Sequence, residues 1–481
     1  MQLIYEKCRG RRATRLDPLD VPAAALPEAL RRARAAELPE VSELDVVRHF
    51  THLSQRNAGV DDRFYPLGSC TMKYNPKAME TAAGHRGFTQ LHPHLSSAAA
   101  YLPRCQGALA LIHELEGLLA EIAGMHAASL QPIAGAHGEL TGALMIAAYH
   151  RDHGNAHKKI ILVPDSAHGT NPASAAMAGF RVVQIPSNAH GLIDMQRFGE
   201  AMTDEVAGIM LTCPNTHGLF EPDVARIAER AHARGALLYY DGANLNAIIG
   251  QCRPGDLGFD VMHYNLHKTF ATPHGMGGPG SGPVGVGERL LPYLPGPRVV
   301  RRGDAYALEM PEKSIGRIAA FFGNFLIAVR AYAYIRTLGD EGLREISRAA
   351  VINANYIHAR LKDVYKPAFD GRFMHECLFT AAPQAEKGVR ALDIAKALLD
   401  CGFYAPTVYF PLTVKECLMI EPTETETKET LDAFCDAMID IARRVDTDPE
   451  SLRTAPHTTP VGRLDEVKAA RELNCAHPPC G

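Results

Sequence analysis

The chain has 481 residues, which is enough for two or three domains around a large buried core. Hydrophobic residues make up 46% of it and charged residues 22%, the proportions of an ordinary soluble globular protein. A net charge of −4 and a pI near 6.6 give no electrostatic reason to expect nucleic acid or an anionic membrane as a partner. The longest apolar stretch, residues 318–329, is too short to span a bilayer.

The eleven cysteines are spread singly along the chain, and no Cys-x-x-Cys pair occurs. This spacing argues against a zinc ribbon or a thioredoxin-type site. Cys401, Cys417 and Cys435 stand in apolar contexts and are predicted to be buried thiols. Free thiols are typical of a reducing compartment, and the first residues lack the apolar core of a signal peptide, so we expect a cytoplasmic protein.

The first hundred residues precede the regular pattern of helices and strands. Residues 1–60 are polar, carry several arginines and include a helical patch over 22–36. We predict an extended arm there rather than a compact domain. A motif-bearing segment then continues to residue 100.

A large domain is predicted over residues 101–325, where helices and strands alternate. Helices are expected at 108–122, 139–150 and 224–231, the last with Asp223 as its N-cap and Gly235 at its end. Strands that alternate with helices indicate βαβ units and a mostly parallel sheet, so the fold class is α/β. Short apolar, β-favouring runs predict strands at 159–163, 181–185, 209–212, 237–240 and 261–264.

A smaller C-terminal α+β domain is predicted over residues 326–481. The tail from Pro456 onward is rich in Pro and His and is expected to be irregular. The predicted helices are 328–338, 349–362 and 427–444, and the predicted strands are 374–380, 407–409 and 418–420.

A lysine and an aspartate carry the chemistry of the large domain. Asp241 ends the strand at 237–240, and Lys268 follows the strand at 261–264, in the string YNLHKTF. Open α/β sheets bind their ligands at the carboxyl ends of the strands. A lysine that can form a Schiff base and a carboxylate that can pair with a pyridinium nitrogen are what pyridoxal phosphate (PLP) requires. The ordinary alternative is a surface lysine and an aspartate that only caps a helix.

Two further segments complete the predicted cofactor site. His168 comes just after the strand at 159–163, where a flat ring could stack on the cofactor; otherwise it is a loop histidine bonded to backbone. Ala134, Gly135 and Ala136 open a predicted helix, whose free N–H groups would hold a phosphate. The glycine-rich residues 275–287 are predicted to be a shaped loop of the active site.

No metal site is predicted. His92 with His94, and His263 with His267, have plausible ligand spacing. No set of carboxylates or cysteines completes either pair, so neither is assigned to a metal.

The chain resembles one family closely, the P-protein of the glycine cleavage system, glycine dehydrogenase (aminomethyl-transferring). Residues 64–76, FYPLGSCTMKYNP, look like the signature near the start of the family's PLP-bearing half; we name them the signature segment. The segments TCPNT (212–216), GLFE (218–221), MIEPTE (419–424) and APHTTP (455–460) also match. The likeness covers nearly the whole chain.

The resemblance implies the second, PLP-bearing subunit of a split enzyme with the fold of type I PLP enzymes. The implied reaction is decarboxylation of glycine, with transfer of the aminomethyl group to the lipoyl arm of H-protein and release of CO2. The implied partners are the first subunit, in an α2β2 assembly, and lipoylated H-protein. The resemblance implies that Lys268, Asp241 and His168 are the catalytic residues. The alternative is another type I PLP enzyme, such as an amino-acid decarboxylase or a cysteine desulfurase.

Overall fold

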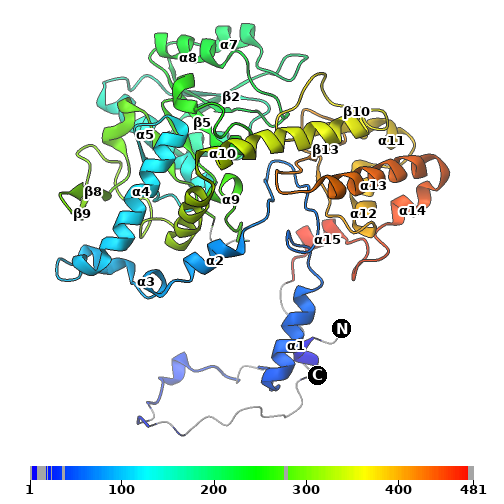
Figure 1. The fold of residues 1–481 in the computed structure, drawn as a ribbon, viewed down its shortest axis with the longest axis horizontal. Coiled ribbons are helices and arrows are strands. Elements are labelled where there is room, and N and C mark those ends of the chain that lie inside the picture. Colours follow the sequence, from blue (N-terminus) through cyan, green and yellow to red (C-terminus); the bar gives the residue numbers. More distant parts are fainter. Residues whose placement is uncertain are drawn as a thin grey trace. The chain divides into compact units, whose positions relative to one another are not determined.

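The computed structural model describes residues 3–7, 18, 20–22, 24–34, 38–275 and 280–474. It divides into two compact units, Arg63–Ala455 and a second one formed by residues from both ends of the chain. The first unit holds every predicted site residue (Figure 1). No helix among the described residues is long and apolar enough to cross a bilayer.

A seven-stranded sheet forms the centre of the Arg63–Ala455 unit, in the order β1-β7-β6-β5-β4-β2-β3. β3, β2, β4, β5 and β6 pair in parallel, whereas β7 runs antiparallel to both of its neighbours. The mostly parallel sheet is therefore confirmed. Its strands are β1 (Ala127–Ser129), β2 (Ile160–Pro164), β3 (Arg181–Ile185), β4 (Val206–Thr212), β5 (Leu237–Asp241), β6 (Val261–His263) and β7 (Val284–Val286).

The central strands form because their side chains are apolar on both faces. Every residue of β2, β4 and β5 is buried, as in a parallel sheet covered by helices on both sides. The five strands predicted in this region are all present, within a few residues of the expected ends. β1 and β7 were not predicted; β7 lies inside the stretch 275–287 that the sequence indicated as a loop, and residues 276–279 of that stretch lie outside the described residues.

A smaller layer follows the long helix α10 (Phe325–Leu361), which Figure 1 shows running from the large sheet toward it. α10 is broken at Gly339, whose φ of 61° is left-handed, so the two predicted helices meet there and the second begins earlier than expected. The smaller sheet has the order β10-β11-β13-β12, with α12, α13 and α14 packed together beside it. Its strands are β10 (Lys366–Pro367), β11 (Cys377–Thr380), β12 (Thr407–Val408) and β13 (Cys417–Ile420), and a separate hairpin is formed by β8 (Arg298–Arg302) and β9 (Ala305–Glu309).

The helices follow the apolar periodicity of the sequence. α4, α5, α8 and α13 each cover a predicted helix. The remaining short helices were mostly not predicted. The helices are α1 (Glu43–Ser54), α2 (Lys77–Ala83), α3 (Arg86–Thr89), α4 (Gln106–Ala123), α5 (Gly135–Asp152), α6 (Thr170–Met177), α7 (Met195–Ala201), α8 (Val224–Ala233), α9 (Leu266–Thr269), α10, α11 (Ala382–Glu386), α12 (Ala391–Asp400), α13 (Lys428–Thr447), α14 (Pro449–Thr454) and α15 (Glu466–Arg471).

Four smaller predictions are wrong. The helical patch expected over 22–36 is reduced, among its described residues, to the 3-10 turn Glu28–Leu30. Asp223 precedes α8 but makes no side-chain cap, because its carboxylate pairs with Arg226 instead. Cys401 is exposed because it lies in the turn after α12, whereas Cys417 and Cys435 are buried as predicted. The tail is not wholly irregular, since α15 forms in it behind an Asp465 cap; residues 475–481 lie outside the described residues.

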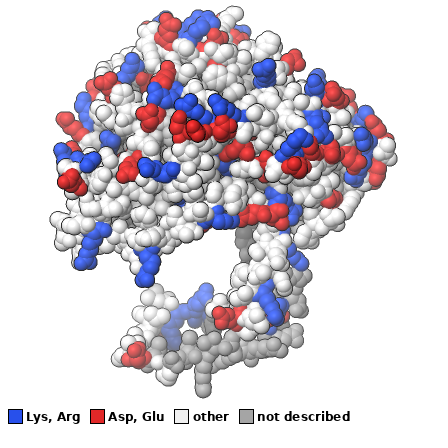
Figure 2. Space-filling view, in the orientation of Figure 1, with Lys and Arg blue, Asp and Glu red and all other residues white. Residues whose placement is uncertain are grey.

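On the face seen in Figure 2, the described residues form no large region of one charge. Lysine and arginine side chains alternate there with aspartate and glutamate. This mixture agrees with the small net charge of the sequence.

Candidate active site

A cavity of about 200 Å³ opens at the carboxyl ends of the central strands. Three of the predicted residues, Lys268, Asp241 and His168, line it together, and Gly135 and Ala136 close one side. Ala134 does not line it but immediately precedes α5 as its N-cap. The structure thus brings together residues from β5, from the loop after β2 and from the start of α5.

Lys268 lies on the short helix α9, which begins shortly after the carboxyl end of β6. Its side chain is half-buried, and its Nζ donates a hydrogen bond to Ser69 O at 2.8 Å. A lysine amine that is partly removed from water and lines a cavity suits a nucleophilic role.

Asp241 is buried at the end of β5 and held rigidly by three donors. It caps the following 3-10 helix by accepting from Ala243 N at 2.9 Å, so the ordinary capping role exists as well. Its other oxygen accepts from Asn171 Nδ2 at 3.0 Å and from Thr212 Oγ1 at 3.3 Å. These hydrogen bonds fix the orientation of the carboxylate at the wall of the cavity.

Two carboxyl groups with different charge states meet in this cavity. Burial alone would raise the pKa of Asp241, but His263, His168 and the N–H of Ala243 favour its charged form and the pKa is lowered. Burial and the negative charge of Asp241 raise the pKa of Glu139 to about 8. Glu139 is therefore mostly protonated at neutral pH beside an ionised Asp241.

His168 lies in the loop between β2 and α6. Its ring is stacked on Phe410, with centroids 5.5 Å apart and planes 19° apart. Its Nε2 is 2.9 Å from Ser69 Oγ. Burial lowers the pKa of His168, so the ring is neutral and flat at the wall of the cavity.

The histidines around Lys268 are neutral as well. Burial lowers the pKa of His267 to about 3, of His274 to about 4 and of His263 to about 4. His263 Nδ1 is bonded to Tyr239 Oη at 2.6 Å. At neutral pH these rings therefore add shape and hydrogen bonds to the site but no full positive charge, and they become charged only at low pH.

The signature segment contacts two residues that line the cavity, and no chemical role was predicted for it. Ser69 bonds to both Lys268 and His168, as described above. Lys73 is buried and donates to Asn246 Oδ1 at 2.7 Å, to Thr269 O at 2.9 Å and to Glu424. Only the family-like string indicated this segment, because its partners come from distant parts of the chain.

The two histidine pairs considered as metal ligands have other contacts in the structure. His92 and His94 stack on each other at 5.4 Å, and His263 is engaged with Tyr239 and Asn265. Within the described ranges one other group brings three ligand-type atoms within 4.8 Å of one another: His375, Glu376 and Glu421. No metal site was predicted at these residues.

The residues present fit PLP. The start of α5 passes so close to the β6–β7 edge that a Cβ on Gly135 would lie 2.5 Å from Asn265 Oδ1, and one on Gly138 would lie 2.5 Å from Gly282 O. Glycine is thus required where the helix offers its N–H groups to the cavity. Glu139 Oε2 is buried without a hydrogen-bond partner among the described residues, which leaves a polar atom for a ligand. An amine, an ionised carboxylate, a flat ring and an anion-binding helix end are the set that PLP needs.

Comparisons with known proteins identify the fold. Residues 126–300 match the family model Aminotransferase class-V, and residues 346–457 match Glycine dehydrogenase, C-terminal domain. A crystal structure of glycine decarboxylase (P-protein) of the glycine cleavage system, in inhibitor-bound form, has a TM-score of 0.70 at 23% identity, over 86% of this chain and 93% of that chain. The fold is therefore that of type I PLP-dependent enzymes.

Full-length relatives narrow the class further. The probable glycine dehydrogenase (decarboxylating) subunit 2 of Caldanaerobacter subterraneus subsp. tengcongensis is 55% identical over 98% of this chain and 97% of its own length. The protein of the same name from Thermotoga maritima is 52% identical over 98% of each chain. The chain belongs to the glycine dehydrogenase (decarboxylating) subunit 2 family, and the alternative of another type I PLP enzyme is not favoured.

Proposed function

We propose that this chain is the PLP-bearing subunit of a glycine dehydrogenase that decarboxylates glycine and transfers the aminomethyl group to the lipoyl arm of H-protein. The observation that carries the proposal is the convergence of Lys268, Asp241, His168 and the start of α5 on one cavity. The similarity to relatives named subunit 2 extends over nearly the whole chain and supports the choice of glycine as the substrate.

Each residue has a role that follows from its surroundings. Lys268 would hold the cofactor through its amine, and the N–H groups at Gly135 and Ala136 would hold its phosphate. Asp241, kept ionised, would hold a proton on the pyridine nitrogen, and His168 would lie flat against the ring. When bound, PLP supplies the electron sink for the pair left by departing CO2.

The partners are part of the proposal. The name of the relatives, subunit 2, supports a first subunit as a partner. An α2β2 assembly, lipoylated H-protein as the acceptor and a cytoplasmic location remain predictions. The domain boundaries at 100 and 325 also remain predictions.

The proposal is tested by cofactor mapping and by exchange of glycine with labelled bicarbonate. Borohydride reduction of the PLP-treated protein, followed by peptide mapping, should place the pyridoxyl group on Lys268. Lys73, which is buried in an ion pair, and Lys313, which is paired with Asp152, are internal controls. Label on either of these, or no exchange with first subunit and lipoylated H-protein present, would show the proposal to be wrong.

A further inference from the structure

A pair of buried glutamates outside the cofactor cavity holds the signature segment. Glu376 immediately precedes β11 and Glu421 immediately follows β13. Cys377 pairs with Ile420 in that antiparallel ladder, so one step further along the register places Glu376 opposite Glu421. Both side chains are fully buried, and they have carboxylate oxygens within 4.8 Å of each other.

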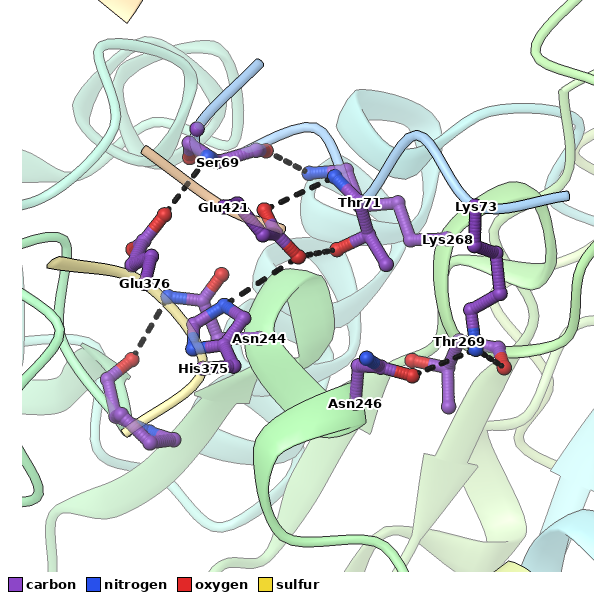
Figure 3. A network of polar contacts seen from close by, with 12 residues as sticks. Ser69, Thr71, Lys73, Asn244, Asn246, Lys268, Thr269, His375, Glu376 and Glu421 are labelled. Atoms are coloured by element: carbon purple, nitrogen blue, oxygen red, sulfur yellow. Dashed lines mark hydrogen bonds and ion pairs between the residues drawn. The ribbon is translucent and has the colours of Figure 1, made fainter. Parts of the chain in front are cut away.

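Two like charges opposite each other in a sheet destabilise it. The presence of this pair therefore calls for an explanation. Figure 3 shows the contacts that provide one. Glu376 Oε2 accepts from Ser69 N at 2.8 Å, and Glu421 Oε2 accepts from Thr71 N at 3.0 Å. Thr71 also donates its hydroxyl to the second oxygen of Glu421.

The two N–H groups bound by these glutamates belong to strained residues. Ser69 has a φ of 65° and Thr71 a φ of 42°, in the left-handed region that residues with a Cβ rarely adopt. Such strain persists only where the surroundings determine it, and it gathers at functional sites. Here the surroundings are the two carboxyl groups, one for each strained residue.

The strained backbone reaches the cofactor site directly. Ser69 presents its carbonyl to Lys268 Nζ at 2.8 Å and its hydroxyl to His168 Nε2 at 2.9 Å, as Figure 3 shows for the lysine. We propose that Glu376 and Glu421 are positioning residues that hold Ser69 and Thr71 in this conformation and thereby place Lys268 and His168 for cofactor binding. The inference rests on the proposed function.

The charge state of the pair agrees with this role. Burial and the charge of Glu421 raise the pKa of Glu376, and burial raises the pKa of Glu421 to about 7. Both shifts favour the protonated form, which reduces the repulsion between the two carboxyl groups. The titratable and charged groups that face the pair are Lys268, His375, Glu424, Cys70, Cys377 and Cys417.

The test compares variants in the full chain assembled with its first subunit. Glu376→Ala and Glu421→Ala should slow the rate at which cofactor-free protein binds PLP by about tenfold or more, because each loses a charge-assisted or buried hydrogen bond to the segment. That rate is followed by visible absorbance, without turnover. Glu376→Gln should restore it to within about threefold, since an amide oxygen still accepts one hydrogen bond from Ser69 N.

The matched control is Glu116→Ala on α4. Glu116 is also buried and also accepts from a backbone N–H, that of Leu130 at 3.2 Å, but it contacts neither Lys268 nor His168. This variant should lower the melting temperature like the others and leave the PLP binding rate within about twofold. Equal PLP binding rates in Glu376→Ala, Glu421→Ala and Glu116→Ala would overturn the inference.

Two further results separate the possible failures. If the wild-type chain does not take up PLP on Lys268, the proposed function fails before the variants matter. If the purified protein holds one divalent ion per chain and His375→Ala removes it, the carboxylates are ligands and the positioning role is overturned.

Discussion

At the scale of single residues, the structure assigns opposite charge states to acids that lie side by side. Asp241 is ionised and Glu139 mostly protonated in the same cavity. The difference comes from neighbours. Burial favours the neutral form of both acids, but His263, His168 and the N–H of Ala243 lower the pKa of Asp241, whereas the charge of Asp241 raises the pKa of Glu139 further. When the surroundings move the pKa values of two carboxyl groups apart, one site can provide both a charged and a neutral acid.

The first prediction concerns Asp241→Asn. The amide can still accept hydrogen bonds and the cavity keeps its shape, so PLP should remain bound. A neutral amide cannot stabilise a protonated pyridine nitrogen, so glycine–bicarbonate exchange per bound PLP should fall by about a hundredfold or more, a few kcal/mol in the barrier. Exchange and PLP content are measured on the same samples.

Asp260→Asn is the control for this prediction. Asp260 is also a buried aspartate, and it immediately precedes β6. It therefore lies at the amino ends of the strands, whereas the cavity lies at their carboxyl ends. Its replacement should lower stability while leaving exchange per bound PLP close to wild type. An Asp241→Asn protein with full PLP and near wild-type exchange would rule out the proposed role of Asp241.

The second prediction is a pH dependence of stability that comes from Glu116. Burial raises its pKa to about 7 in the folded chain, from an ordinary value of 4.5. The folded state therefore holds a proton that the unfolded state has released between these values. Stability from this group is fully present below about pH 4.5, falls as the pH rises to about 7 and is level above that.

Glu116→Gln removes this titration. Relative to wild type, the variant should gain stability between pH 4.5 and 7, by at most about 3 kcal/mol. The free energy of unfolding in denaturant at several pH values measures the difference, and buried acids common to both proteins, such as Glu139, cancel in it. A constant difference across this pH range would contradict the prediction.

At the scale of elements, glycines mark where segments approach closely. Leu67 bridges to Ile420 of β13, and a Cβ on Gly68 would lie 2.2 Å from Met419 Cγ and 2.8 Å from Met419 O. The side chain of Met419 can move, but its backbone oxygen cannot without disturbing β13. Only glycine therefore lets the signature segment lie against this strand.

The third prediction follows from that contact. Gly68→Ala should push the segment away from β13, lower the melting temperature and weaken PLP binding, with a cost of about 1–3 kcal/mol. Gly117→Ala is the control with the opposite sign. Gly117 is an exposed position inside α4 with no atom within 4 Å of the added Cβ, so alanine should stabilise the helix by about 0.5–1 kcal/mol. Two variants with equal melting temperatures would contradict the argument.

Local patterns predicted the elements that are apolar along their whole length and missed those that depend on distant pairing. β2 and β5 were found because their apolar runs are continuous. β1 and β7 are three residues each and exist because Ala127 pairs with Val286. In the site, Lys268, Asp241 and His168 could be predicted because each follows a predicted strand. Ser69 and Glu376 are 307 positions apart, and no local pattern joins them.

At the scale of the whole molecule, the chain has features of a subunit that needs a partner. The relatives it matches over nearly its full length are named subunit 2. In the unit formed by the chain ends, α1 exposes three large apolar side chains, Leu44, Val47 and Phe50. Exposed apolar groups of this kind mark contact surfaces or cause self-association.

The last prediction is that the chain alone is nearly inactive in glycine–bicarbonate exchange and self-associates. Obligate interfaces commonly bury more than about 2,000 Å² and are largely apolar, so a chain without its partner exposes that surface to water. Adding the first subunit should restore both a single defined species in size-exclusion chromatography with light scattering and exchange with lipoylated H-protein. The same addition with H-protein lacking its lipoyl group should restore the defined species but not full exchange, which separates assembly from chemistry. Full exchange from the lone chain as a well-behaved monomer would contradict the need for a first subunit.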